Sequence, residues 1–572
     1  MNKRRAKTLA LALVVSVFAA ACGSGSDDNT TSDSATDSSA ATGDSTASTE
    51  GGGEGGAGEL IDGGTFVGDP PEHIDPALNS TLDAYQVINA MYDGLTDIDA
   101  SDPANPKIVP DVATEVKPND DATVWTFKIR DDEFFSNGEQ VMPSSFTRAW
   151  NRAAKLGGDY SYLLGFLDGG QEALDSKGAT PISGAVADDA TMTLTVTLDK
   201  PYANFDAVAG FQLFFPMPSE VDKLDDEGNK NYENGMMVGN GPFMLESART
   251  DEVIVLVPNP KWNGSIAGTK APTLTKLTFR TIADPDTSYN ALEAGEVDTA
   301  NIPSGRVTEA ADNWGTTLET SILGSYHWVV NSNSPVVGGD KNLKLREAID
   351  QAINRDEINE SVYNNSRTPS TGVVPEGIPG FKPGLCSVCT YDEAKAKAAF
   401  DEWKAAGNSL SEPITLQFNA DAGHEPVVQI IIDNLKTIGI EAVAEPMPTE
   451  TYFSTLADGG CKMICRAGWF ADYPTYDNFM YDLFHGDSIG GNNLGPFVNA
   501  EFDKLITEAK QTPDKPTAFG LYNQAETILL NDVGVIPITW YKGDYAFNAD
   551  KLEGFKQTNF GLIPWEDIKI KG

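Results

Sequence analysis

The chain has 572 residues and carries 84 acidic against 41 basic side chains, a formal net charge of −43 at pH 7. This charge argues against binding to nucleic acid or to an anionic surface, and it is compatible with cationic or zwitterionic ligands. A chain of this length exceeds what one hydrophobic core usually supports, so we expect at least two lobes.

The first 22 residues predict a lipoprotein signal peptide. Basic residues at positions 3–7 precede an apolar run over residues 9–18 that is too short to span a membrane. The following Ala-Ala-Ala-Cys resembles a bacterial lipobox, whose cysteine is lipidated, although that pattern usually has leucine where Ala19 stands. An ordinary secretory signal is the alternative. We expect an extracytoplasmic protein, on the cell surface or in a periplasm, anchored to the cell membrane through Cys22.

Residues 23–59 predict a disordered acidic tether. The segment consists mostly of Ser, Thr, Gly, Ala and Asp and contains no basic or aromatic residue. Such a composition buries too little apolar area to offset the entropy cost of ordering. A flexible chain of this length has a root-mean-square reach of roughly 30 to 35 Å, which would hold a folded body clear of the bilayer.

Alternating apolar and polar residues predict half-buried strands over residues 125–129, 192–198 and 414–418. Apolar stripes at helical spacing predict amphipathic helices over residues 345–353 and 428–435. Together these patterns indicate an α/β chain.

A third helix is expected to end at Gly407. Thr390 and Glu393 match a capping box at its start.

Four cysteines follow Cys22, in one C-x-x-C and one C-x-x-x-C pair. Outside the cytoplasm disulfides are the default, and we favour a local bridge between Cys386 and Cys389. An extended Cys461 to Cys465 would separate the Cα atoms by about 13 Å, too far for a bond unless the stretch turns. A four-thiolate zinc site and a redox C-x-x-C are the alternatives.

Residues 466–473 form an apolar, strand-like segment, Arg-Ala-Gly-Trp-Phe-Ala-Asp-Tyr, that ends in an aspartate. A buried carboxylate beside an aromatic ring costs several kcal/mol unless it meets a cation. A ligand ammonium is one such cation, so the segment suggests a capture site for a peptide terminus. From spacing alone, a turn-forming role ahead of Tyr473 is equally good for Asp472.

Several segments resemble the extracellular solute-binding proteins of peptide and nickel ABC transporters, especially the oligopeptide- and dipeptide-binding branch. The likeness runs from about residue 60 to the C-terminus. Residues 125–152 match the family's strand, Asn-Gly turn and helix. Further segments follow in the family's order: LTVTLDKPYANF, VGNGPFML, VPNPKWNG, ALEAGEVDTA, LREAIDQAINRDEI, LKTIGIEA, RAGWFADYP and LYNQAETILLNDVGVIPITWY.

The resemblance implies an α/β, bilobal fold like that of the type II periplasmic binding proteins, with an extra domain inserted in the N-terminal lobe. The implied boundaries are residues 60–100, 223–318 and 541–572 for lobe I, 101–222 for the inserted domain, and 319–540 for lobe II. Crossover strands over residues 325–331 and 536–541 would form the hinge.

Members of the peptide-binding branch clamp an extended peptide between the lobes, and main-chain hydrogen bonds give affinity that is independent of side chains. By resemblance, Asp472 pairs with the peptide α-ammonium and Arg466 meets a ligand carboxylate. A salt bridge between strands is the alternative for Arg466. Gly468 and Phe470 would offer backbone groups. Trp469 would supply a pocket wall, with ordinary packing as the alternative.

Other candidate ligand-binding residues come from three further segments. They are Asn79, Ser80 and Thr81 of a loop in lobe I, Tyr160 and Tyr162 of the inserted domain, and Tyr326, His327 and Trp328 of the first crossover. For the crossover residues, a place in the core is the equal alternative. Ser80 replaces an acidic residue of some oligopeptide binders, so a preference for cargo length does not carry over.

The resemblance implies the receptor of an ABC importer that captures oligopeptides or dipeptides and delivers them to a membrane permease with cytoplasmic ATPases. We expect a monomer without a cofactor and without enzymatic activity, because the chain lacks the G-x-S-x-G and H-E-x-x-H motifs. The alternative is a non-peptide cargo: nickel, haem, an opine or other cationic metabolite, or an oligosaccharide. A structural surface role without a ligand is a third class. Most of the carboxylates are better explained as keeping an extracellular protein soluble than as contacts to a cationic ligand.

Overall fold

The computed structural model describes residues 57–102, 106–264, 271–420 and 423–572. The expected signal peptide with Cys22, and residues 23–56 of the expected tether, lie outside these ranges. The tether prediction is wrong at its end, because strand β1 (Gly58–Val67) already begins at Gly58. Among the residues described, no helix combines the length and the apolar character that a membrane crossing requires.

A mixed seven-stranded sheet has the order β12-β19-β11-β1-β10-β9-β8. Strand β1 lies at its centre and runs parallel to both of its neighbours, β10 and β11. The other strands are β8 (Phe243–Leu245), β9 (Val253–Pro258), β10 (Leu274–Ile282), β11 (Thr299–Asn301), β12 (Gly315–Thr316) and β19 (Tyr545–Phe547). The C-terminal part of the chain therefore returns to complete a sheet that begins at the N-terminal end.

An antiparallel four-stranded sheet has the order β4-β5-β7-β6. Its strands are β4 (Ala113–Pro118), β5 (Val124–Ile129), β6 (Ala185–Asp188) and β7 (Thr193–Thr197). Strands β5 and β7 confirm two predicted strands, with Trp125 and Phe127 buried as the alternation requires. These rings belong to one hydrophobic cluster with Leu60 and Phe279 of the seven-stranded sheet, so the two sheets share a core.

A six-stranded sheet has the order β14-β18-β13-β17-β15-β16. Its strands are β13 (Ser321–Val330), β14 (Thr368–Pro369), β15 (Ile414–Asn419), β16 (Ala442–Met447), β17 (Ile464–Phe470) and β18 (Val535–Lys542). Along β13, Tyr326 and Trp328 enter one hydrophobic cluster and Leu323 and Val329 enter another. Successive side chains point to opposite faces of a sheet, so this sheet has a core on each face.

The structure corrects two local predictions. Strand β15 was expected to be half-buried, but all of its residues are buried because packed side chains cover both faces of the sheet. Helix α10 (Glu393–Ala405) is capped by Asp392, whose carboxylate accepts from the N–H of Lys395 at 3.0 Å. The capping box expected at Thr390 is therefore wrong.

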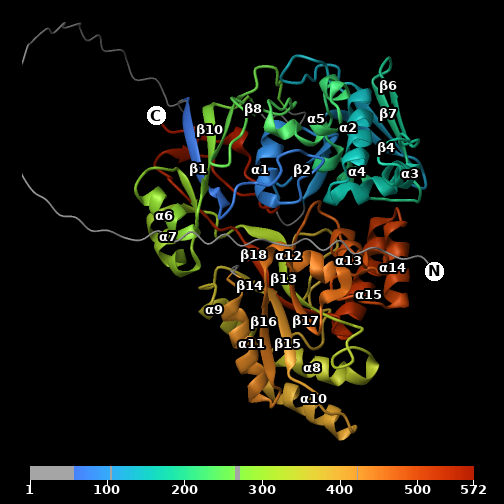
Figure 1. Cartoon of the computed structure of the whole chain (residues 1–572), viewed down its shortest axis with the longest axis vertical. Helices are drawn as coiled ribbons and strands as arrows, with labels where there is room; N and C mark the ends of the chain where they lie inside the picture. Colours follow the sequence, from blue (N-terminus) through green and yellow to red (C-terminus); the bar gives the residue numbers. More distant parts are fainter. Residues whose placement is uncertain (1–56, 103–105, 265–270, 421–422) are drawn as a thin grey trace, which may run out of the picture. The chain divides into compact units, whose positions relative to one another are not determined.

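Helices α8 (Leu343–Ala352) and α11 (Glu425–Thr437) confirm the two predicted amphipathic stripes, and Figure 1 shows them beside the strands of the six-stranded sheet. The remaining α-helices are α1 (Leu82–Met91), α2 (Pro143–Leu156), α3 (Gly170–Asp175), α4 (Phe205–Ala209), α5 (Asp226–Lys230), α6 (Pro285–Glu293), α7 (Val307–Asn313), α9 (Arg355–Ser361), α12 (Thr449–Thr455), α13 (Asp477–Phe484), α14 (Ala500–Lys510) and α15 (Lys515–Asn531). Two antiparallel two-stranded sheets complete the set of strands, β2 (Thr96–Asp99) with β3 (Lys107–Pro110), and β20 (Leu552–Glu553) with β21 (Lys569–Ile570).

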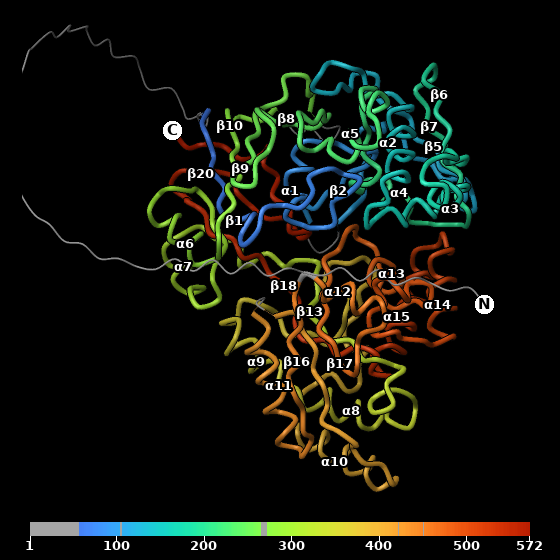
Figure 2. The backbone as a smooth tube through the Cα atoms, in the orientation of Figure 1, coloured from blue at the N-terminus to red at the C-terminus, as the bar shows by residue number. Residues whose placement is uncertain are grey.

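The chain passes between the seven- and six-stranded sheets in two connections, from β12 to β13 and from β18 to β19. These connections lie side by side, since the N–H of Gly543 donates to the carbonyl of Thr320 at 2.9 Å. Thr317 and Tyr545 also exchange hydrogen bonds, the backbone N–H of Tyr545 reaching Thr317 Oγ1 at 3.0 Å. In Figure 2 the tube at β18 can be followed from one sheet towards the other. The predicted hinge segments, residues 325–331 and 536–541, lie almost entirely within β13 and β18 and not in these connections. A hinge motion there stays a prediction.

Candidate ligand-binding site

A cavity of about 290 Å³ opens at the end of β17. We call it the cleft cavity. The predicted residues that line it are Ser80, Thr81, Arg466, Gly468, Trp469, Phe470 and Asp472. Its other walls are Leu82, Tyr85, Ile98, Tyr160, Phe211, Gln212, Phe453, Ala471, Tyr541, Phe560 and Leu562. The cavity thus gathers segments that are hundreds of residues apart in the sequence.

Asp472 provides a carboxylate on the cavity wall just beyond the end of β17. The hydroxyl of Tyr160 donates to its Oδ1 at 2.7 Å, and Asn478 Nδ2 donates to its Oδ2 at 2.9 Å. Burial raises the pKa of Asp472 to about 6, and these two hydrogen bonds oppose that rise. No basic side chain of the described residues pairs with this carboxylate. It is therefore a fixed anionic group that faces the cavity without a counter-charge.

Asn478, in α13, holds both the aspartate and the neighbouring indole in place. Its Oδ1 accepts from Trp469 Nε1 at 3.1 Å and from the backbone N–H of Asp472 at 3.0 Å. Its Nδ2 also donates to Asp482 at 3.0 Å. Asn478 is fully buried, so these bonds are shielded from water and fix the geometry of the wall.

Arg466 provides the opposite charge on the same strand. The one hydrogen bond of its guanidinium to a described residue joins Nη1 to Asn419 Oδ1 at 3.5 Å, and its Nε is buried without a partner. The guanidinium lies 5.0 Å from the centre of the Tyr326 ring. A Cβ added at Gly468 would lie 3.0 Å from Tyr541 Oη, 3.2 Å from the carbonyl oxygen of Ser325 and 3.3 Å from Arg466 Nη2, so a side chain fits here only if these neighbours shift. No carboxylate of the described residues pairs with Arg466, so the salt-bridge alternative gains no support.

Arg367 is a second cation in this region, and no sequence pattern identifies it. Its guanidinium lies 3.7 Å from the ring centre of Tyr363 and 4.6 Å from that of Tyr541, which lines the cleft cavity. Its Nη1 is buried without a partner. In the described part of the chain, Arg367 forms no ion pair with a carboxylate, so it adds to the positive charge near Arg466.

One edge of β17 is open beside the cavity. The strand pairs with β13 along its whole length, but with β15 only at Ile464 and Cys465. Within the described ranges, no strand pairs with the β15-side edge of residues 466–470. A ligand backbone can add to such an edge through main-chain hydrogen bonds. This geometry suits the backbone role expected of Gly468 and Phe470.

Five predicted residues do not reach the cleft cavity: Asn79, Tyr162, Tyr326, His327 and Trp328. Asn79 is buried and shapes the loop, because its Oδ1 accepts from the N–H of Thr81 at 3.0 Å. Tyr326 is fully buried beneath Arg466. Tyr162 instead borders a separate cavity of about 500 Å³, so Tyr160 is the tyrosine that contacts Asp472.

His327 and Trp328 are buried in the core. For the residues of the first crossover, the structure therefore favours the core alternative.

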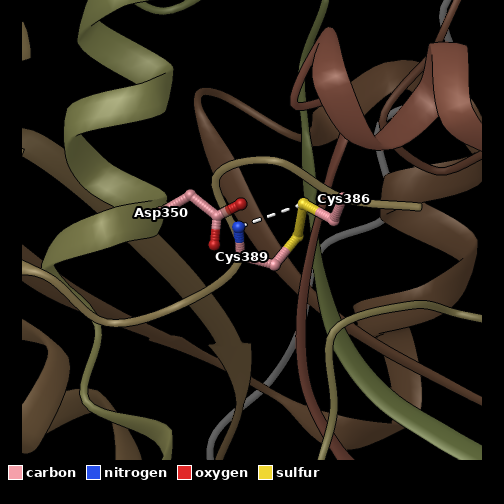
Figure 3. Close-up of side chains that lie close together, drawn as sticks. All are labelled: Asp350, Cys386 and Cys389. Carbon is pink, nitrogen blue, oxygen red and sulfur yellow. Dashed lines mark hydrogen bonds between the residues drawn. A yellow bond between two sulfur atoms is a disulfide. The ribbon is translucent and has the colours of Figure 1, made fainter. Parts of the chain in front are cut away.

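The cysteines form two local disulfides. Cys386 pairs with Cys389 and Cys461 with Cys465, with Cα separations of 5.7 and 6.0 Å. The second pair forms because the chain turns there, and β17 begins only at Ile464. In the described part of the chain, the one compact group of potential metal ligands is Asp350 with Cys386 and Cys389, shown in Figure 3. The sulfur atoms of Cys386 and Cys389 form a disulfide, so this group offers no thiolate ligand to a metal ion.

Comparison with known proteins gives consistent matches over most of the chain. The family model described as bacterial extracellular solute-binding proteins, family 5, middle, matches residues 107–491. The dipeptide-binding protein DppE of Bacillus subtilis is 26% identical over 510 residues, covering 87% of this chain and 90% of that protein. The periplasmic murein peptide-binding protein MppA of Escherichia coli is 27% identical over 517 residues, covering 86% of this chain and 92% of that protein.

Among solved structures, the periplasmic binding protein DppA of Helicobacter pylori, in complex with the peptide STSA, matches with a TM-score of 0.74. The identity is 23%, and the match covers 91% of this chain and 99% of that one. The structure of the murein tripeptide binding protein MppA of E. coli matches with a TM-score of 0.73. The α/β periplasmic-binding-protein fold expected from the sequence is thereby confirmed.

Proposed function

Because the chain belongs to the bacterial extracellular solute-binding proteins of family 5, we propose that it binds short peptides in the cleft cavity. One observation carries the proposal: an unpaired carboxylate, Asp472, and an unpaired guanidinium, Arg466, face the same cavity. A peptide with free termini supplies the complementary charges. The names of the relatives, a dipeptide- and a murein peptide-binding protein, support a peptide cargo.

In the proposed complex, the peptide α-ammonium meets Asp472 and its carboxylate meets Arg466, with Arg367 adding positive charge. The peptide backbone adds to the open edge of β17. Asp472 follows Arg466 by six positions, so their Cα atoms lie at most about 20 Å apart. A ligand that bridges both groups in an extended conformation is therefore limited to about six residues.

The test is thermal unfolding of the full chain with mixed peptides of two to five residues, their N-acetylated forms, and nickel. A ligand present at 100 times its dissociation constant should stabilise the fold by about 2.7 kcal/mol. We expect free peptides to raise the midpoint and the acetylated forms to raise it far less. No shift with any free peptide would overturn the proposal, and a shift with nickel alone would favour metal cargo.

The rest of the proposed role concerns the cell envelope. We infer that the protein is attached to the membrane through lipidated Cys22 and passes cargo, as a monomer, to a permease driven by cytoplasmic ATPases. The apolar run followed by Cys22 supports attachment. Partition of the wild-type protein into a detergent phase, and its loss in Cys22→Ala, would test the anchor. Equal partition of both proteins would contradict it.

A further inference from the structure

A second cavity, of about 150 Å³, adjoins the cleft cavity and has an acidic lining. The two cavities share four wall residues, Tyr85, Ile98, Phe560 and Leu562. The carboxylates of the second cavity are Asp93, Asp97, Asp111 and Glu566, and no basic residue of the described chain lines it. We call it the acidic side cavity.

Asp111 is a buried carboxylate of the acidic side cavity that no described residue pairs with. It follows β3 and is only 5% exposed, and its carboxylate makes no hydrogen bond to any described residue. Burial, together with the negative charges of Asp93, Asp97 and Glu133, raises its pKa well above the usual range. A buried carboxylate without a partner is costly. No described residue supplies the hydrogen-bond donor or cation that would offset this cost.

The basic group that acts on Asp111, Arg130, is engaged elsewhere. Arg130 Nε donates to Asp132 at 2.6 Å and its Nη1 donates to the carbonyl of Gly264 at 2.8 Å, so it reaches Asp111 only through a longer-range attraction. Asp93 is held by Trp262 Nε1 at 2.6 Å. Within the described ranges, no side-chain N–H or O–H donates to the carboxylate of Asp111 in this way.

The geometry does not suit a bound metal ion. Among the described residues, the one set of three or more acidic, histidine or cysteine groups with ligand atoms within 4.8 Å of one another is that of Asp350 with Cys386 and Cys389. No three carboxylates of the acidic side cavity thus bring their oxygens within 4.8 Å of one another. Carboxylates between aromatic walls such as Tyr85, Trp262 and Phe560 suit an elongated organic cation.

We propose that the acidic side cavity takes the cationic side chain, lysine or arginine, of a peptide whose backbone lies in the cleft cavity. The cavity is about as large as one that holds a benzene-sized group, and the shared wall places it beside the ligand. This inference rests on the proposed peptide function. It makes the protein selective for basic peptides, in keeping with its charge of −43.

The experiment measures binding of Ala-Ala-Ala and of its variants with lysine or norleucine at each position, by titration calorimetry with the full chain. At one position we expect lysine to bind about tenfold more tightly than norleucine. Asp111→Asn and Glu566→Gln should each reduce this preference to about threefold or less and leave Ala-Ala-Ala binding unchanged. Glu566 is only half-buried, so its variant serves even if Asp111→Asn does not fold.

A second readout follows the protons. Burial raises the pKa of Asp93 to about 7 and that of Glu566 to about 8, and a bound cation lowers both. Lysine peptides should therefore release protons near neutral pH, seen as a dependence of the binding heat on the buffer, whereas norleucine peptides should not. Equal affinity of lysine and norleucine at every position would overturn the side cavity alone. If no peptide binds, including Ala-Ala-Ala, the proposed function falls as well.

Discussion

Asp472 presents a carboxylate that no other described residue neutralises, so we expect it to contribute strongly to the binding free energy of a cationic ligand. Replacing it with asparagine would leave a bound α-ammonium unpaired at a desolvated position, at a cost of roughly 3 to 5 kcal/mol. Asp472→Asn should therefore weaken binding of peptides with a free amino terminus by about two to three and a half decades. Titration calorimetry measures this loss.

Two controls separate loss of the charge pair from general damage to the protein. Asp120→Asn changes an exposed carboxylate in the turn between β4 and β5 and should bind peptides as the wild type does. N-acetylated peptides lack the ammonium, so Asp472→Asn should hardly change their weaker affinity. An equal loss for free and acetylated peptides would mean that Asp472 acts only through the fold.

Tyr160 is the hydroxyl donor to Asp472, at 2.7 Å, and its neighbour Tyr162 lines a different cavity. This hydrogen bond favours the ionised carboxylate and so lowers the pKa of Asp472. Tyr160→Phe should leave less of Asp472 ionised at neutral pH and thus weaken peptide binding by roughly threefold to tenfold, and Tyr162→Phe should leave it unchanged. Isothermal titration of the two matched variants checks this, and similar losses in both would contradict the assignment.

For single residues, the sequence predicts the charged residues of a local motif but not the residues that contact them in the folded protein. Asp472 and Arg466 stand in one short segment that carries the family resemblance. Asn478 and Arg367 contact that segment only after tertiary packing, and no spacing marks them. The sequence also offered Tyr160 and Tyr162 together, because adjacent side chains diverge only once the backbone is folded.

The strand that carries the site is fixed by a covalent clamp at its start. The disulfide between Cys461 and Cys465 closes the turn into β17. Crosslinking a loop of this size stabilises a fold by about 2 kcal/mol in the chain-entropy account. We expect Cys461→Ser with Cys465→Ser to lower stability by about that amount and also to weaken peptide binding, as measured by denaturant unfolding and calorimetry.

The other disulfide provides a matched control. Cys386 and Cys389 lie before α10, outside both the cleft cavity and the acidic side cavity. Their double serine variant should lose a similar stability and retain full peptide affinity. If both double variants bind equally well, the clamp does not position the site.

The secondary structure was predictable from the sequence where an element has one face exposed to solvent. In strands β5 and β7 and helix α11 the polar residues of the period are partly or fully exposed. Helix α8 keeps the predicted apolar stripe but also buries Arg346, Asp350 and Gln351. Strand β15 shows alternation in its sequence, yet Thr415 and Gln417 are buried because cores form on both faces of the sheet. Burial by distant parts of the chain leaves no trace in a local pattern, so this error could not be avoided.

Across the whole molecule, buried carboxyl groups should make stability depend on pH. Burial raises the pKa of Glu526 to about 7 and those of Glu133 and Asp482 to about 8, above ordinary values near 4. The folded state therefore binds more protons than the unfolded state between about pH 4 and 8. Stability falls as pH rises through that window.

We expect the free energy of unfolding to be several kcal/mol lower at about pH 8.5 than at about pH 5.5. Glu526→Gln should flatten this slope, because an amide does not titrate in this pH range. The amide oxygen can still accept the hydrogen bond from Tyr476, so the fold is retained. The exposed Glu501→Gln serves as its control. Urea unfolding across the pH range measures the slope, and a stability that rises towards pH 8.5 would contradict the account.

The order of the sheets along the chain was predictable because the resemblance spans nearly all of it. The shared core of the seven- and four-stranded sheets was not, since an inserted domain is expected to pack within itself. Composition indicated the overall acidity. It did not indicate that carboxylates such as Asp111 gather around one small cavity.

The two adjacent connections between the sheets have a consequence for engineering. Because Thr320 and Gly543 are joined by a backbone hydrogen bond of 2.9 Å, the whole segment between them leaves and re-enters the rest of the protein at one point. In topological terms it is a cassette with paired ends, which is the arrangement that tolerates circular permutation and domain exchange. Related receptors could thus be recombined at these two positions, trading one half of a binding site without redesigning the other.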